Sequence, residues 1–210
     1  MIRFIRCASL VLTISLFCTE RAAAQSAYIQ GGIVMDARRF SGQPDDRVFD
    51  ANVSSMMIGG AGFVTALISA GLELDAGRES EVAQTTAVTI AGRPEVVTTT
   101  YSSRRRSVSA LFGIHSSAAH AVRAGVYAGL AFTAFHQRIA TAAPPIVLSA
   151  PPPPTEFAHL AATPIVGVDV AVSISRHLAL VGAVRAQSLS FGSELSGFSV
   201  RPGAAARVMF

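Results

Sequence analysis

In several stretches of this chain the charged side chains fall within one set of alternate positions, and the chemistry open to them is ion pairing. All the basic residues besides histidine are arginines, whose planar guanidinium can contact several carboxylates and keeps its charge. Charges in a low-dielectric interior are costly unless they are paired and hydrogen-bonded, so we expect these groups to face one another. The predicted lumen network is Asp36, Glu73, Asp75, Arg105, Arg123, Asp169, Arg185, Arg201 and Arg207.

Histidine offers a second chemistry, but its spacing in this chain matches no known kind of site. The histidines are His115, His120, His136, His159 and His177. No two have the i, i+4 spacing of a helical zinc site, and His115, His120 and His177 fall at expected short turns, where a solvated histidine is ordinary. The acidic cluster Asp45, Asp46 and Asp50 could bind a cation, although loop solvation accounts for it. The sequence therefore predicts no catalytic residue, no metal site and no cofactor.

A two-residue period predicts the strands that would position the charged groups. From Phe198 to Phe210, one set of alternate residues is apolar and the other is small or charged; a strand separates such sets, whereas a helix would mix them. Five further stretches share this design: 68–75, 107–115, 122–132, 158–174 and 177–188. Two weaker stretches, 28–38 and 54–64, bring the count to eight, and the phase of the glycine-rich second one is ambiguous.

The composition is that of an apolar chain without a spanning helix. Half of the residues are hydrophobic and 14% are charged, yet no stretch approaches the ~20 consecutive apolar residues that a membrane helix needs. The stretch 121–135 contains Gly125-x-x-x-Gly129, as helix-pairing segments do, but Arg123 and its short length favour a strand. In hydrocarbon, strands leave no backbone group unpaired only if their sheet closes. We therefore expect an all-β fold, a closed antiparallel up-and-down transmembrane β-barrel of eight strands.

The connections between the predicted strands alternate in length. Long ones are expected at 39–53, 76–98 and 138–155, short ones at 65–67, 116–120 and 175–176, and a moderate one at 192–196. This alternation is typical of outer-membrane barrels, in which long loops face outside and short turns face the periplasm. In the third long loop, Pro151–Pro154 predicts a stiff extended arm, because proline favours the polyproline conformation.

The N-terminus has the three parts of a secretory signal. A basic segment, 1–6, precedes a short apolar one, 8–17, and Ala22–Ala24 supply small residues before a predicted cleavage site at Gln25. We expect residues 1–24 to be a cleaved signal peptide and 25–210 to be the barrel domain. Both cysteines, Cys7 and Cys18, lie in the signal, and its removal lowers the net charge from +4 to +2. A charge this small predicts no nucleic-acid partner.

Together these features resemble the small eight-stranded outer-membrane barrels of the OmpA-like and OmpX-like group, over about residues 26–210. The resemblance implies the outer membrane of a Gram-negative bacterium, periplasmic termini, a monomeric state and lipid contact. It also implies that Ala206, Val208 and Phe210 form the C-terminal signal read by the barrel-assembly machinery and periplasmic chaperones, although Ala206 is smaller than the pattern favours. Tryptophan is absent and tyrosines are few, so we expect a sparse aromatic girdle.

Several functions fit such a barrel. A structural or surface-interaction role without catalysis is the leading hypothesis, since an eight-stranded interior is filled by side chains and the charged network would form a plug. A small porin or transporter for small solutes is the first alternative, and a lipid-modifying enzyme is the second, although the His-x-Ser-Asn motif of lipid A deacylases is absent. A soluble lipocalin-like barrel would invert the two faces, with apolar residues inside. The sequence identifies no ligand for the loops.

Overall fold

The computed structural model describes residues 27–41, 48–90, 92–117, 121–143, 152–191 and 195–210. Several predictions fall outside these ranges: the signal peptide 1–24, the loop acids Asp45 and Asp46, His120, and Pro151 of the proline run. No helix among the described residues is long and apolar enough to cross a membrane.

The described chain consists almost entirely of strands in one antiparallel sheet. The strands are β1 (Ala27–Ser41), β2 (Ala51–Phe63), β3 (Ile68–Gly77), β4 (Ser80–Ile90), β5 (Arg93–His115), β6 (Val122–Ala142), β7 (Thr155–Ser173), β8 (Leu178–Phe191) and β9 (Leu195–Met209). Their order is β3-β2-β1-β9-β8-β7-β6-β5-β4, and a further pairing of β3 with β5 closes the sheet. Eight strands thus form the barrel, as predicted, and β4 lies outside it.

The barrel has its apolar side outward. Ile33, Met56 and Leu160 are 65%, 75% and 73% exposed on its outer surface, while their strand neighbours alternate into the interior. This arrangement confirms the predicted faces and shows that the inverted, lipocalin-like alternative is wrong. It also resolves the phase of 54–64, because Ser55 and Met57 are buried and Met56 is not. The stretch 121–135 lies mostly in β6, so the helical alternative is wrong too.

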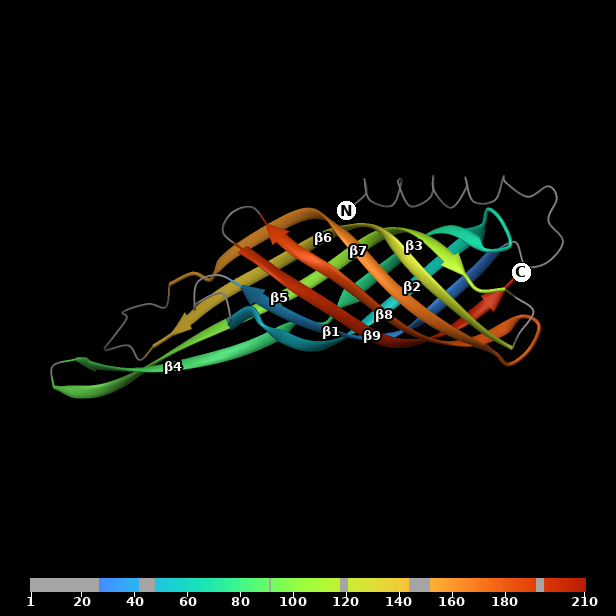
Figure 1. The fold of residues 1–210 in the computed structure, drawn as a ribbon. Coiled ribbons are helices and arrows are strands. Elements are labelled where there is room, and N and C mark those ends of the chain that lie inside the picture. Colours follow the sequence, from blue (N-terminus) through green and yellow to red (C-terminus); the bar gives the residue numbers. More distant parts are fainter. Residues whose placement is uncertain (1–26, 42–47, 91, 118–120, 144–151, 192–194) are drawn as a thin grey trace.

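The two ends of the barrel differ. Tight turns join β2 to β3 and β7 to β8: the Val64 amide donates to the Ile68 carbonyl, and the Ile174 amide to that of Leu178, both at 2.8 Å. These turns lie at the end that carries the C-terminus (Figure 1). At the opposite end β5, β6 and β7, of 23, 21 and 19 residues, continue past the barrel. The predicted long excursion at 76–98 is therefore a β-hairpin, β4 with the start of β5, that extends the sheet.

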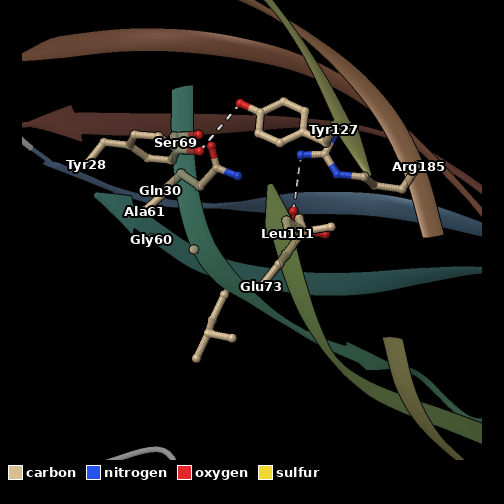
Figure 2. A pocket seen from close by; sticks show the side chains of 11 residues that line it. Tyr28, Gln30, Gly60, Ala61, Ser69, Glu73, Leu111, Tyr127 and Arg185 are labelled. Carbon is tan, nitrogen blue, oxygen red and sulfur yellow. Dashed lines mark hydrogen bonds and ion pairs between the residues drawn. The ribbon is translucent and has the colours of Figure 1, made fainter. Parts of the chain in front are cut away.

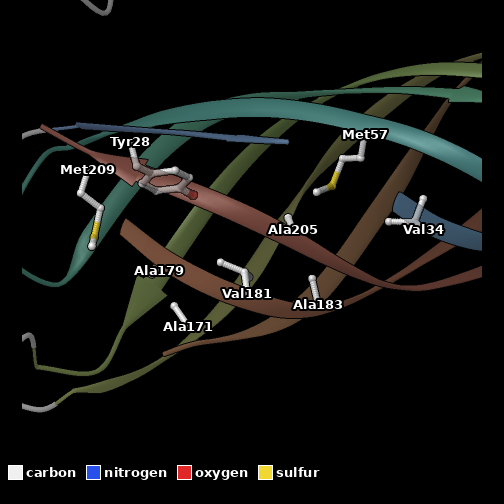
Figure 3. Packing of buried hydrophobic residues seen from close by; sticks show 9 residues of the cluster. All are labelled: Tyr28, Val34, Met57, Ala171, Ala179, Val181, Ala183, Ala205 and Met209. Atoms are coloured by element: carbon white, nitrogen blue, oxygen red, sulfur yellow. The ribbon is translucent and has the colours of Figure 1, made fainter. Parts of the chain in front are cut away.

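Small side chains are prominent among the buried apolar residues of the lumen. Four buried alanines, Ala171, Ala179, Ala183 and Ala205, pack with Val181 and with the larger Tyr28 and Met209 (Figure 3). In a closed eight-stranded sheet the interior has space for side chains and little else. Alanines on β7, β8 and β9 thus leave space in the lumen for a few large residues.

Candidate functional site

The centre of the lumen holds two carboxylates and two arginines, and one of the arginines, Arg105, bridges the carboxylates. Arg105 Nε donates to Asp36 Oδ2 at 2.8 Å, and its Nη2 donates to Asp75 Oδ2 at 3.0 Å. Arg201 also donates to Asp75, and Ser199 Oγ donates to Asp36 Oδ1 at 2.7 Å. All four charged side chains are buried, so each ion is stabilised by its partners instead of by water.

Gln187 connects this central group to the barrel wall. Its Oε1 accepts from Arg105 Nη1 at 3.4 Å and from Arg201 Nη2 at 3.3 Å. Its Nε2 donates to the hydroxyls of Thr133 and Thr163 at 2.6 and 2.9 Å. Every polar atom of this buried amide therefore has a hydrogen-bond partner, and the amide oxygen contacts both arginines in addition to the carboxylates.

A second charged group lies nearer the short turns. Asp169 Oδ2 accepts a hydrogen bond from the Tyr127 hydroxyl at 2.6 Å and also binds the guanidinium of Arg207. Arg207 donates to Gln30 Oε1 from Nε and Nη2, at 3.0 and 2.8 Å, and lies 4.1 Å over the ring of Tyr28. The arginine is thus held by a carboxylate, an amide and an aromatic face together.

Glu73 and Arg185 form a third pair between the two groups. Arg185 Nη2 lies 3.3 Å from Glu73 Oε2, and its guanidinium lies 4.6 Å over the Tyr127 ring (Figure 2). Beside this pair is a small cavity lined by polar groups of Gln30, Ser69 and Glu73, with room for about one water molecule.

Of the nine predicted network residues, Arg123 is not part of these three groups. It lies at the start of β6, donates to the Ala66 carbonyl of the β2–β3 turn at 2.7 Å and packs 4.4 Å over the ring of Phe63. Its membership of the network stays a prediction, because alternation indicates the face of a residue but not its depth in the barrel. At the rim, a turn carbonyl is a nearer partner than any lumen carboxylate.

Arg38 is a lumen arginine that the predicted network left out. Its side chain is 0% exposed, and its Nε lies 3.5 Å from Asp36 Oδ2, without hydrogen-bond geometry. The guanidinium lies 5.4 Å from the centre of the Phe135 ring. A signal was present in the sequence, because the alternation of 28–38 already placed Arg38 on the inward face two residues after Asp36.

An aromatic cluster lies in the lumen on the far side of Arg38 from the short turns. Phe40 and Phe135 have ring centres 5.3 Å apart, and Phe191 stacks on Phe135 at 5.4 Å. Phe49, Leu189 and Leu195 complete this aromatic cap. The interior thus changes from charged to apolar toward the end from which the long strands extend.

The histidines occupy separate places. His115 is buried, with Nε2 at 2.7 Å from Ser69 Oγ, so its expected solvation at a turn is wrong: the alternation of β5 points it into the lumen. His177 contacts the Met209 carbonyl at 3.1 Å, His159 contacts Gln137 at 3.1 Å, and His136 lies 3.7 Å from the exposed Glu156. Within the described ranges, no three metal-binding side chains come together.

The last strand lies between β8 and β1. Ala206, Val208 and Phe210 all point to the outer surface, and Phe210, 60% exposed, donates its amide to the Ala27 carbonyl at 3.0 Å. β9 pairs with β1 from Met209 opposite Tyr28 to Ser196 opposite Ser41, so the two ends of the barrel sequence meet side by side.

The comparisons with known proteins bear on the fold alone. The chain matches no protein-family model and no curated protein sequence. Among solved structures, Neisserial surface protein A is 13% identical with a TM-score of 0.52, over 90% of this chain and 100% of that one. The chain has the fold of a small outer-membrane β-barrel. The N-terminal barrel of Pseudomonas aeruginosa OprF, 12% identical, matches over 89% of this chain and 98% of that one with a TM-score of 0.46.

Proposed function

We propose that this protein is a sealed outer-membrane barrel that presents an extended β-sheet at the cell surface for contact with other molecules, without catalysis. The observation that carries the proposal is the division of the molecule into a filled lumen and a protruding hairpin. The outer surface of the barrel is apolar, as contact with lipid requires, and the closed sheet leaves no backbone edge in the bilayer.

Two successive barriers support the sealed lumen. The ion pairs of Arg105, Arg185, Arg201 and Arg207 span the middle of the interior, and the aromatic cap lies beyond them. A solute would have to separate buried ions and displace packed rings. Separating a buried pair leaves an uncompensated charge, which costs about 3–5 kcal/mol.

The proposed orientation places the short turns and the C-terminus in the periplasm and the β4–β5 hairpin outside. It rests on the difference in length between the two sets of connections, since outer-membrane barrels have short periplasmic turns and long outer loops. An epitope inserted at Gly92, the hairpin tip, should bind antibody on intact cells, and one inserted at Ser175 should bind only after the outer membrane is opened.

Conductance in planar bilayers tests the sealed lumen. The purified wild-type protein should give no steady channel. A variant with Asp36, Asp75 and Asp169 replaced by alanine, if it still shows a folded barrel by circular dichroism, should conduct, because its arginines lose their partners. Steady large openings of the wild-type protein would overturn the plug and favour the porin alternative.

A further inference from the structure

Strand β4 has one edge that no described strand covers. Along its whole length, from Ser80 opposite Ser103 to Ile90 opposite Arg93, it pairs with β5. No other strand in the ranges that the structure describes pairs with it. Every side chain from Ala83 to Thr89 is exposed, and the hairpin projects past the barrel (Figure 1). Among the described residues, its free edge is therefore a row of backbone groups without a strand partner.

This edge lacks the features that usually prevent strands from pairing. Proteins protect exposed edges with proline, lysine, inward charges or bulges. β4 contains no proline and no lysine, and its one charged residue is Glu81, at its beginning. From Val82 to Ile90 the strand is uncharged and rich in valine and threonine, which favour strand pairing.

The sequence of β4 is close to a palindrome centred on Thr85. Within Val82–Val88, Val82 mirrors Val88, Ala83 mirrors Ala87, and only the Gln84 and Thr86 pair differs, whereas the outer pairs Glu81 with Thr89 and Ser80 with Ile90 do not match. When two copies of such a strand pair antiparallel about this centre, each residue lies opposite its mirror position on the same face of the sheet. Valine then meets valine and alanine meets alanine, with threonine opposite threonine at the two-fold axis.

We propose that β4 binds β4 of a second copy of this chain, antiparallel, with the two Thr85 residues opposite each other. The inference rests on the proposed function, because it needs the hairpin outside the cell. β4 runs outward along the long axis of the barrel, so two copies joined antiparallel have their barrels pointing in opposite directions (Figure 1). Such copies lie in two facing membranes, and the contact is one between cells.

Charge favours this geometry over pairing within one membrane. Two barrels in the same membrane point the same way, so their β4 strands would meet in parallel, with the two Glu81 side chains near each other at the same end of the pair. Like charges close together across a strand pair destabilise it. In the antiparallel arrangement Glu81 lies opposite Thr89, and the two glutamates are roughly 26 Å apart at ~3.3 Å per residue.

Single-cysteine variants test the register. In the full chain with Cys7 and Cys18 replaced by serine, Thr85→Cys should form a disulfide-linked dimer on mild oxidation, since directly opposed strand residues have disulfide geometry. Val82→Cys and Val88→Cys should each stay monomeric alone and should cross-link when mixed. Cross-linking of Val82→Cys with itself would indicate parallel pairing and would overturn the proposal, as would the absence of any cross-link.

Charge exchange at Thr85 tests the contact between membranes. Wild-type protein in phosphatidylcholine vesicles should cluster the vesicles, as measured by light scattering. Thr85→Lys vesicles and Thr85→Glu vesicles should each fail to cluster alone, because like charges meet at the two-fold axis, and should cluster when mixed. Thr98→Lys, which places the same charge on β5 directly opposite Thr85, is the matched control and should cluster like wild type.

The outcomes separate this inference from the proposed function. If an epitope at Gly92 is exposed on intact cells but wild-type vesicles stay dispersed, the self-pairing is wrong and the sealed surface barrel stands. If that epitope is hidden on intact cells, the proposed orientation fails and the self-pairing fails with it. Clustering that survives both Thr85→Lys and Thr85→Glu would also overturn the self-pairing, because the contact would then not involve the β4 edge.

Discussion

Polar groups are paired differently in the lumen and in the β4–β5 hairpin. Inside the barrel, carboxylates and guanidinium groups from distant strands satisfy one another, as Asp75 of β3 does with Arg201 of β9. In the hairpin, one edge of β4 pairs with β5 and the other is open to solvent. The ion pairs of the lumen therefore form within the barrel, whereas one edge of β4 has backbone groups that no described strand pairs with. We therefore expect the lumen to determine the free energy of unfolding of the barrel, and the hairpin to determine its association with a second copy.

The largest effect should follow from removing a carboxylate shared by two arginines. Asp75→Ala deprives Arg105 of one partner and Arg201 of its carboxylate, and breaking a buried ion pair costs about 3–5 kcal/mol. Urea unfolding in lipid vesicles, followed by heat-modifiable migration on gels, measures the loss. Glu156→Ala, which removes an exposed partner of Arg138, is the control and should change the free energy of unfolding by less than ~1 kcal/mol. Equal stability of the two variants would show that the lumen network does not hold the barrel together.

Assembly should depend on the terminal aromatic residue. Phe210→Ala should lower the amount of barrel in the outer membrane several-fold while synthesis and export continue, because the resemblance assigns Phe210 to the signal of the assembly machinery. Phe210→Trp retains an exposed aromatic and is the matched control. Quantitative blotting of outer-membrane and periplasmic fractions measures both. Normal membrane levels of the alanine variant would remove Phe210 from that signal.

A close approach of β2 and β3 should make one glycine hard to replace. A Cβ at Gly71 would collide with the Gly60 carbonyl oxygen and with Ala61, whereas a Cβ at Gly182, on the outer surface of β8, meets open space. Gly71→Ala should destabilise the barrel by about 1–3 kcal/mol, as overpacking does. Gly182→Ala should be nearly neutral in the same urea titration. Similar values for both would mean that β2 and β3 move apart without cost.

The smallest effect on stability should come from removing the hairpin. Ala83 lies opposite Thr100, so replacing residues 84–99 with Asn-Gly joins the strands by a two-residue turn. The free energy of unfolding should change by less than ~1 kcal/mol, since the removed residues line no part of the lumen. Vesicle clustering should be lost in the same protein. A barrel that fails to fold without the hairpin would contradict the division between the two regions.

The sequence predicts the barrel strands but does not predict the hairpin strand β4. The barrel strands were predictable because one face of each meets lipid, so Ile33 and Met35 alternate visibly with Val34 and Asp36. β4 was not, because both of its faces are exposed and Gln84, Thr85 and Thr86 show no apolar period. For this reason the sequence pattern of residues 76–98 was interpreted as a loop.

The sequence predicts which charged residues face the lumen, but not how far along the barrel each of them lies. Alternation places Asp36, Arg105 and Arg201 in the interior, and the structure brings them together. It cannot show that Arg123 lies at the rim. The partners that complete the site, such as Gln187 and Tyr127, are neutral, and nothing in their spacing distinguishes them from other inward residues.

The continuity of β5 has a mechanical consequence. One strand runs from the hairpin tip at Arg93 to the far end of the barrel at His115, and it pairs with β6 from Thr98 to His115. A pull on the tip along the barrel axis therefore loads many backbone hydrogen bonds in shear at once, instead of opening them one after another. Tension between two attached cells would pass through the hairpin into the membrane-embedded wall, and the weakest link would be the β4 contact itself.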